Sequence, residues 1–349
     1  MANTEIHIPD PELEKLIRRE LKKLDGPITD DDLAELKSIQ GWGSRSKEGI
    51  VDLRGIEHCI NLQVLKLSHN EIIDLSPLSA LANLQTLWLS DNQIIDLSSL
   101  SGLTNLQQLH LSDNPINNLS SLNGLTNLQQ LSLQGNELND LSPLQGLTNL
   151  QHLNLRNNQI SDFSPLSQLT NLLMLSLEGN QVNNLNPLRN LTSLNDLALH
   201  HNWIDDLNPL HGLTNLQRLN LVDNKVGDIE PLKELTQLES LTLHNNQVRD
   251  LSPLKELVEL RVLILHNNQI KDLRPLSELT NLTSLWLDGN QISDLNPLSG
   301  LTSLKKLTLR DNRVSDISPL SGLPNLQELD LRRQLERPNV MRRIAALFR

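Results

Sequence analysis

A column of asparagines at constant spacing limits how this chain can fold more than any other feature. Twelve asparagines follow one another at intervals of 22 residues, from Asn70 to Asn312. Each closes a leucine frame, as in Leu62, Leu65, Leu67 and Asn70. One repeat of this length cannot bury its own apolar face, so neighbouring repeats must stack and share a core. The spacing therefore predicts one elongated stack of repeats.

Within a repeat, the apolar pattern predicts a short strand followed by a thin return segment. If the first leucine is position 1, apolar residues recur at positions 1, 4, 6, 11, 14, 17 and 20. Positions 3 to 7 alternate, which predicts a strand that pairs in parallel with the next repeat. Pairs such as Ser76-Pro77 suit the N-cap and first position of a short 3₁₀ turn. The predicted fold is an α/β solenoid with a parallel sheet on the concave face and 3₁₀ or extended segments on the convex face.

Two polar columns of the repeat have structural explanations. The asparagine amide can donate to and accept from the backbone of adjoining turns, which satisfies groups that a buried, bent chain would leave without partners. Position 13 is usually aspartate, as in Asp74, but Asn118 and Asn184 occupy it in two repeats. An acceptor oxygen therefore matters there and charge does not, so we expect turn capping rather than metal binding.

The two ends differ from the repeats. Residues 1–49 are predicted to form a helical N-terminal cap. Asp10-Pro11 is a helix start, and a second short helix begins at Thr29, which with Asp32 resembles a capping box. The first helix should turn Leu13, Leu16, Ile17, Leu21 and Leu24 to one face, and Leu33, Leu36 and Ile39 should also point inward.

Residues 50–334 hold one half repeat and about 13 repeats of 22 residues. Residues 335–349 are predicted to form a C-terminal capping helix that begins at Pro338. The alternative is the first helix of a further domain. Trp42 and Cys59 are expected in the core of the capping region.

Composition narrows the possible partners. The formal net charge is -12, which argues against nucleic acid and anionic membranes because both need a positive face. Cys59 is the only cysteine, and no apolar stretch approaches the length of a membrane span. The expected protein is a cytoplasmic monomer without membrane insertion, or a secreted one if a signal peptide has been removed.

The frame LxxLxLxxN, carried from Leu62 to Leu331, resembles the leucine-rich repeat. The helical segment from Asp10 to Ile39, the junction at residues 52–57 and the 22-residue repeats resemble the internalin group and the phosphatase-regulating subunits of the same repeat length. The internalin resemblance implies an exported, anchored adhesin that binds a host receptor in the hollow of the arc. Bacterial Roco-type GTPases carry similar repeats, which implies a second context, the sensing part of a signalling enzyme.

Function is expected at the positions that the frame leaves free, chiefly 3, 5 and 7 on the concave sheet. Two patches stand out there, one around Trp88 and a larger one around Trp286, because exposed tryptophans are enriched at binding hot spots. A trough of this kind suits a protein or peptide ligand better than a small molecule. The predicted partner-binding residues are Trp88, His110, Arg156, Glu178, His200, Val222, His244, Val262, Ile264, His266, Trp286, Asp288 and Arg310.

Catalytic and metal sites are not predicted. His244 and His266 occupy one position in adjacent repeats and could approach a shared ion, but no third ligand is evident. Solvated or partner-contacting histidines are the preferred interpretation, with a pH-sensitive contact as the alternative. No phosphate loop, zinc-protease helix or serine elbow is present in the sequence. The prediction is a non-enzymatic scaffold with no cofactor.

Overall fold

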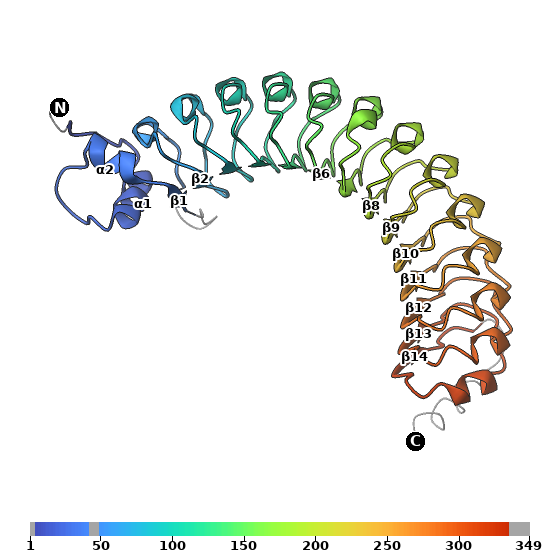
Figure 1. Cartoon of the computed structure of the whole chain (residues 1–349). Coiled ribbons are helices and arrows are strands. Elements are labelled where there is room, and N and C mark those ends of the chain that lie inside the picture. Colours follow the sequence, from blue (N-terminus) through green and yellow to red (C-terminus); the bar gives the residue numbers. More distant parts are fainter. Residues whose placement is uncertain (1–3, 42–48, 335–349) are drawn as a thin grey trace. The chain divides into compact units, whose positions relative to one another are not determined.

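The computed structural model describes residues 4–41 and 49–334. The chain divides into two compact units, Met1–Ser176 and Leu177–Arg349. In each unit, short parallel strands lie on one side and 3₁₀ turns on the other (Figure 1). The predicted fold class, a repeat solenoid of parallel strands and 3₁₀ turns with an N-terminal helix, is confirmed.

The first unit contains two helices, α1 (Pro11–Leu21) and α2 (Asp30–Glu35), ahead of its strands. Each strand pairs in parallel with the next, and from β2 onward the partners are 22 residues apart, as in Leu65 and Leu87. The strands are β1 (Ser38–Gln40), β2 (Val64–Lys66), β3 (Thr86–Trp88), β4 (Gln108–His110), β5 (Gln130–Ser132), β6 (His152–Asn154) and β7 (Met174–Ser176). The 3₁₀ turns are η1 (Ile56–His58), η2 (Ser76–Ala80), η3 (Ser98–Leu100), η4 (Ser120–Leu122), η5 (Ser142–Leu144) and η6 (Ser164–Gln168).

The second unit repeats this pattern with the same parallel register, as in Leu263 and Leu285. Its strands are β8 (Asp196–Ala198), β9 (Arg218–Asn220), β10 (Ser240–Thr242), β11 (Val262–Ile264), β12 (Ser284–Trp286), β13 (Lys306–Thr308) and β14 (Glu328–Asp330). Its 3₁₀ turns are η7 (Asn186–Leu188), η8 (Asn208–Leu210), η9 (Glu230–Leu232), η10 (Ser252–Leu254), η11 (Arg274–Leu276), η12 (Asn296–Leu298) and η13 (Ser318–Gly322).

The core lies between the strand side and the turn side of each repeat. Leu87 and Leu89 enter it from the strand, and Leu100 and Leu103 enter it from the turn; all four are fully buried. Odd positions of the strand point the other way, so the open sheet face is built from the residues that the frame leaves free.

The asparagine column acts as predicted. Asn114 donates through Nδ2 to the carbonyl of Leu111 in its own repeat (3.1 Å) and to that of Leu89 in the preceding one (3.0 Å). Its Oδ1 accepts from the N–H of Ile94 (3.0 Å). Each such amide therefore joins two adjacent repeats through buried backbone groups. Where asparagine gives way to Gln334, the longer amide makes the same bonds to Val314, Leu309 and Leu331.

The acidic column caps turns, also as predicted, but the turn itself begins one residue earlier than the Ser-Pro pattern indicated. The 3₁₀ turn η2 begins at Ser76, so Ser76 is its first residue and not its N-cap. Asp74 accepts from the N–H and the hydroxyl of Ser76, both at 2.8 Å. Asn118 accepts from the N–H of Ser120 in the same way (2.8 Å), which confirms that an acceptor oxygen is what the position requires.

The N-terminal helices follow their predicted start signals. Asp10 accepts from the N–H groups of Glu12 and Leu13 at the start of α1, and its second oxygen accepts from Val51 (2.8 Å). Thr29 and Asp32 form the expected capping box of α2. Cys59 is fully buried, as expected, and burial raises the pKa of its thiol to about 12.

Two residues of the N-terminal cap differ from the expectation. The helix α1 ends at Leu21, with Lys22 in the left-handed conformation as C-cap, so Leu24 lies beyond the helix and is 85% exposed instead of inward. Ile39 is buried but belongs to the strand β1, not to a helix. Trp42 and the predicted helix at residues 335–349 lie outside the described residues.

One feature of the repeat was missed. The residue at position 8, just before the asparagine, has a positive φ in every described repeat. Examples are His69, Asp91 and the glycines Gly135, Gly179 and Gly289. Only glycine, and among other residues chiefly Asn, Asp and His, tolerates this region. The restricted composition of position 8 was the available signal.

Replacing Asn114 by Ala should lower the free energy of unfolding by about 1 to 3 kcal/mol, because it removes a buried amide with its hydrogen bonds to two repeats and leaves the N–H of Ile94 without its partner. Chemical denaturation followed by circular dichroism measures this loss. The matched control is Asn117→Ala in the same repeat, an exposed asparagine outside the column. Equal effects of the two substitutions would contradict the assigned role.

Candidate functional site

The larger predicted patch lies on the open sheet face of the second unit and spans strands β10 to β12. His244 follows β10, and Ile264 and His266 lie at the end of β11 or just beyond it. Trp286 closes β12, directly opposite Ile264 in the strand register. These side chains are half-buried, and Val262 beside them is half-buried as well. We call these five residues the histidine–tryptophan cluster.

The rings of the cluster lie in one row, in which the two imidazoles are stacked and the indole is tilted. The imidazoles of His244 and His266 lie 4.0 Å apart between centroids with an interplanar angle of 18°. The ring of Trp286 follows at 6.2 Å from His266 with a tilt of 30°. On the other side of Trp286, the ammonium of Lys306 lies 5.0 Å from the ring centroid, within the range of a cation–π contact. The row crosses the strands diagonally, from position 7 to position 3.

Burial sets the charge state of the two histidines. Desolvation, which is the larger cause, and the neighbouring imidazole of His266 together lower the pKa of His244 to about 4. Desolvation also lowers the pKa of His266. The Nδ1 atoms of both rings are buried and have no hydrogen-bond partner among the described residues. Both imidazoles are therefore neutral at pH 7, and the stack behaves as an aromatic surface rather than a positive one.

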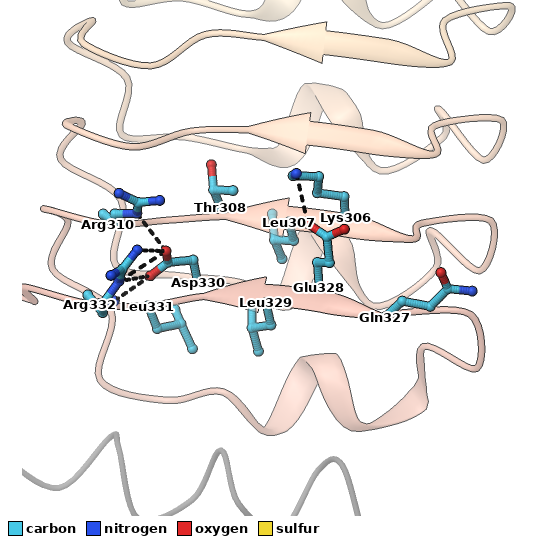
Figure 2. Close-up of a pocket in the computed structure, with 10 residues that line it drawn as sticks. All are labelled: Lys306, Leu307, Thr308, Arg310, Gln327, Glu328, Leu329, Asp330, Leu331 and Arg332. Carbon is cyan, nitrogen blue, oxygen red and sulfur yellow. Dashed lines mark hydrogen bonds and ion pairs between the residues drawn. The ribbon is translucent and has the colours of Figure 1, made fainter.

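A charged network borders the cluster at strands β12 to β14. Lys306 forms an ion pair with Glu328 (2.7 Å), and Asp330 accepts from both Arg310 and Arg332 (2.6 Å each), as Figure 2 shows. These residues line a cavity of about 570 Å³. The hydrogen bonds from Arg332 and Arg310 hold the pKa of Asp330 at about 2, so the carboxylate stays ionised.

Asp288 and Arg310, both predicted site residues, are joined in this network. Asp288 accepts from the hydroxyl of Thr308 (2.9 Å) and from the backbone N–H of Arg310 (2.7 Å). The network fixes these charged side chains before any partner arrives.

The smaller patch, in the first unit, has a similar composition. Trp88 stands between Lys66 of β2 and His110 of β4, its direct partners in the sheet register. The Lys66 ammonium lies 3.5 Å from the ring centroid, and the His110 ring stacks at 4.9 Å with an angle of 15°. Burial, together with the Lys66 charge, lowers the pKa of His110. The indole faces are thus covered by neighbours from both sides.

The remaining predicted residues are placed differently from one another. Arg156 is exposed in the first unit. In the second unit, Glu178 is buried at 6% exposure and pairs with His200 through Oε2 and Nε2. Val222 is also 6% exposed. Glu178 and Val222 offer a partner little surface, whereas His200 is half-buried. In the second unit, the larger accessible group of predicted residues is therefore the histidine–tryptophan cluster with its charged border.

Two lysines were not among the predicted site residues, although the structure places them on the tryptophans. Lys66 shares position 5 with Trp88, so direct strand pairing was an available signal. Lys306 is at position 3 of the repeat after Trp286. It is a diagonal neighbour of Trp286, which pairing of equal repeat positions does not predict.

Residues 4–41 and 49–334 were compared with the requirements of a membrane-spanning helix and of a metal site. No helix in this part of the chain combines the length and apolarity needed to cross a bilayer. No group of three or more His, Cys, Asp or Glu side chains is arranged to hold a metal ion in the same residues.

The repeats match a known family. The model described as Leucine Rich repeats (2 copies) matches residues 60–102, 82–124, 104–146, 126–168, 214–256, 258–300 and 302–338. These matches cover more than half of the chain, so it is a leucine-rich-repeat protein. Proteins of this class generally bind other proteins, and the fold is typically a non-catalytic scaffold.

Two solved structures of bacterial leucine-rich-repeat proteins are similar to this chain over most of its length. An internalin, inlF of Listeria monocytogenes, is 36% identical with a TM-score of 0.90, over 94% of this chain and 96% of that chain. A leucine-rich-repeat protein of Leptospira interrogans is 27% identical with a TM-score of 0.83, over 90% and 89%. The comparison with curated proteins finds no match. The identity to inlF over nearly the whole chain shows that this protein belongs to the internalin-like group of leucine-rich-repeat proteins.

A third structure contains a bound partner. The leucine-rich-repeat ectodomain of the plant membrane receptor kinase GASSHO1/SCHENGEN3 from Arabidopsis thaliana was solved in complex with CASPARIAN STRIP INTEGRITY FACTOR 2. It is 25% identical with a TM-score of 0.71, and the match covers 88% of this chain and 43% of that chain.

The lowered pKa of His244 predicts a specific pH response. The folded pKa of His244, about 4, lies below the unfolded value near 6.5, so the unfolded chain binds more protons between these limits. The His244 contribution to stability is therefore complete above pH 6.5 and is lost as the pH falls towards 4. NMR titration should give a His244 midpoint near 4, and the variant His244→Gln should lose less stability than wild type between pH 7 and 4.5. A midpoint near 6.5 would show that the ring is solvated.

Proposed function

We propose that this chain is a non-enzymatic scaffold that binds a protein or peptide partner on the open sheet face of its second unit. The observation that carries the proposal is the histidine–tryptophan cluster. It is a run of half-buried aromatic and apolar side chains from three adjacent strands, on the face that the repeat frame does not use for its core. Large, rigid side chains of this kind dominate the energetics of protein interfaces.

The border of the cluster supports recognition of a polypeptide. Asp288, Arg310, Asp330 and Arg332 present both signs of charge beside the apolar rings. An apolar centre with a polar, charged rim is the usual anatomy of a protein interface. The complex of the plant receptor ectodomain with its named factor is a further support, because that protein shares the fold. We propose a monomeric scaffold with no cofactor.

The proposed scaffold has two candidate locations, inside the cell or on its surface, and the second of these would make it an adhesin. The similarity to inlF over nearly the whole chain favours an exported, internalin-like adhesin over the sensing domain of a Roco-type GTPase. A cytoplasmic scaffold is the first candidate. Antibody labelling of intact and permeabilised cells distinguishes the two: labelling of intact cells supports the adhesin, and labelling that requires permeabilisation supports the cytoplasmic scaffold.

Replacing Ile264 and Trp286 together by Ala should weaken partner binding by about 2 kcal/mol, or roughly thirtyfold in Kd, because both anchors of the proposed interface are lost. The partner is first captured by affinity purification with the wild-type chain, and its Kd is then measured by calorimetry. Trp203→Ala is the matched control, since this tryptophan is 53% exposed in the same unit but lies outside the strands. Unchanged binding of the double variant, with an unaltered fold, would remove the cluster as the site.

A further inference from the structure

Three exposed aliphatic side chains occur at one repeat position in the first unit. Val51, Ile73 and Ile95 are 48%, 54% and 55% exposed. All three are at position 12, which follows the buried core position represented by Ile72 and Ile94. We call them the apolar ridge. The frame does not require an apolar residue there, because the other repeats carry Asn117, Asn139, Ser161, Asn183, Asp205, Gly227, Arg249, Lys271, Ser293 and Ser315.

The ridge is a row and not three scattered residues. The N–H of Glu71 donates to the carbonyl of Ile50 (3.0 Å), and the N–H of Gln93 donates to that of Ile72 (3.0 Å). These bonds join consecutive repeats one or two residues away from the ridge positions. Backbones paired in this way run about 4.8 Å apart, so the three side chains follow one another at about that spacing.

The flanks of the ridge are acidic. Asp52, Asp74 and Asp96 follow the three ridge residues in sequence, and Glu71 lies on the other side of Ile73. Asp52 forms an ion pair with Arg54 (2.6 Å). Asp74 and Asp96 accept hydrogen bonds from neutral serines, which leaves their charge in place. An apolar row bordered by carboxylates complements an apolar stripe bordered by lysine or arginine.

The spacing of the ridge selects the conformation of the partner. Side chains on one face of an α-helix recur about every 5.4 Å, once per turn. Ridge residues recur about every 4.8 Å, so over two steps the helix and the ridge differ in length by only about 1 Å. Side chains on one face of an extended strand recur about every 6.7 Å, and the mismatch over two steps is about 4 Å. A helix lying along the row can therefore contact all three ridge residues, and it fits their spacing better than a strand does.

We propose that the apolar ridge is a docking surface for an amphipathic helix of a protein partner, whose apolar stripe is flanked by basic residues. The helix lies along the row of repeats, with successive turns on Val51, Ile73 and Ile95 and its lysines or arginines over Asp74, Asp96 and Glu71. The apolar ridge is not part of the sheet face. The proposal for the ridge is therefore independent of the function proposed for the histidine–tryptophan cluster.

The test uses a defined probe, a capped helical peptide of Leu, Ala and Lys of about 18 residues, with leucines at i, i+4, i+7 and i+11 and lysines on both sides of that stripe. Fluorescence anisotropy measures its binding to the full chain. The variant Ile73→Asn with Ile95→Asn should weaken binding at least about tenfold. Asparagine is the residue that other repeats carry at this position, so the fold should be retained, and an unchanged unfolding midpoint verifies this.

A gain-of-function variant makes the test sharper. Asn117→Ile extends the ridge by one repeat and should tighten binding of the same peptide severalfold. A peptide with Glu in place of Lys should bind at least about tenfold more weakly than the original, because the flanks then repel it.

Three outcomes would overturn the proposal. One is equal affinity of wild type and the double asparagine variant for the peptide. Another is tighter binding of a strand-forming peptide with alternating Leu and Lys. The third is concentration-dependent dimerisation of the wild-type chain that the double variant abolishes, which would assign the ridge to a second copy of this chain.

Discussion

The structure depends on the satisfaction of buried backbone groups across the boundary between repeats. A repeat of 22 residues turns sharply, and its inner carbonyls and N–H groups cannot all pair within the sheet. The Asn114 amide solves this by contacting Leu89, Ile94 and Leu111, which belong to two repeats. Because an unpaired buried polar group costs more than a hydrogen bond contributes, the amide is a condition for stacking and not an addition to it.

This constraint explains why so much of the fold was predictable. The asparagine contacts, the Asp74 turn cap and the Asp10 and Thr29 helix starts are all local or strictly periodic, so one sequence contains the information for them. Leu24 is a residue that the periodic pattern alone places wrongly. Its spacing fits the apolar face of α1, but Lys22 adopts a left-handed conformation and terminates the helix before that face reaches it.

The candidate site was less predictable because its contacts are diagonal. Strand register places residues of equal position side by side, and that rule is enough to pair Trp88 with His110. Trp286 instead contacts His266 and Lys306, two positions further along and two positions back in the neighbouring repeats. Such contacts depend on which rotamer each long side chain adopts, and rotamers respond to packing on all sides.

Both tryptophans of the sheet face are held in place before a partner binds. Trp88 lies between Lys66 and His110, and Trp286 lies between His266 and Lys306. Contacts on both sides restrict the indole rotamer, so a partner that meets the exposed edge need not order the side chain, and the entropy cost of binding falls. The same contacts cover the faces of the Trp88 ring, and for Trp286 they place a tilted imidazole on one side and an ammonium on the other. The geometry therefore favours a partner that packs against ring edges and the adjacent Ile264, rather than a planar ligand that must stack on a free indole face.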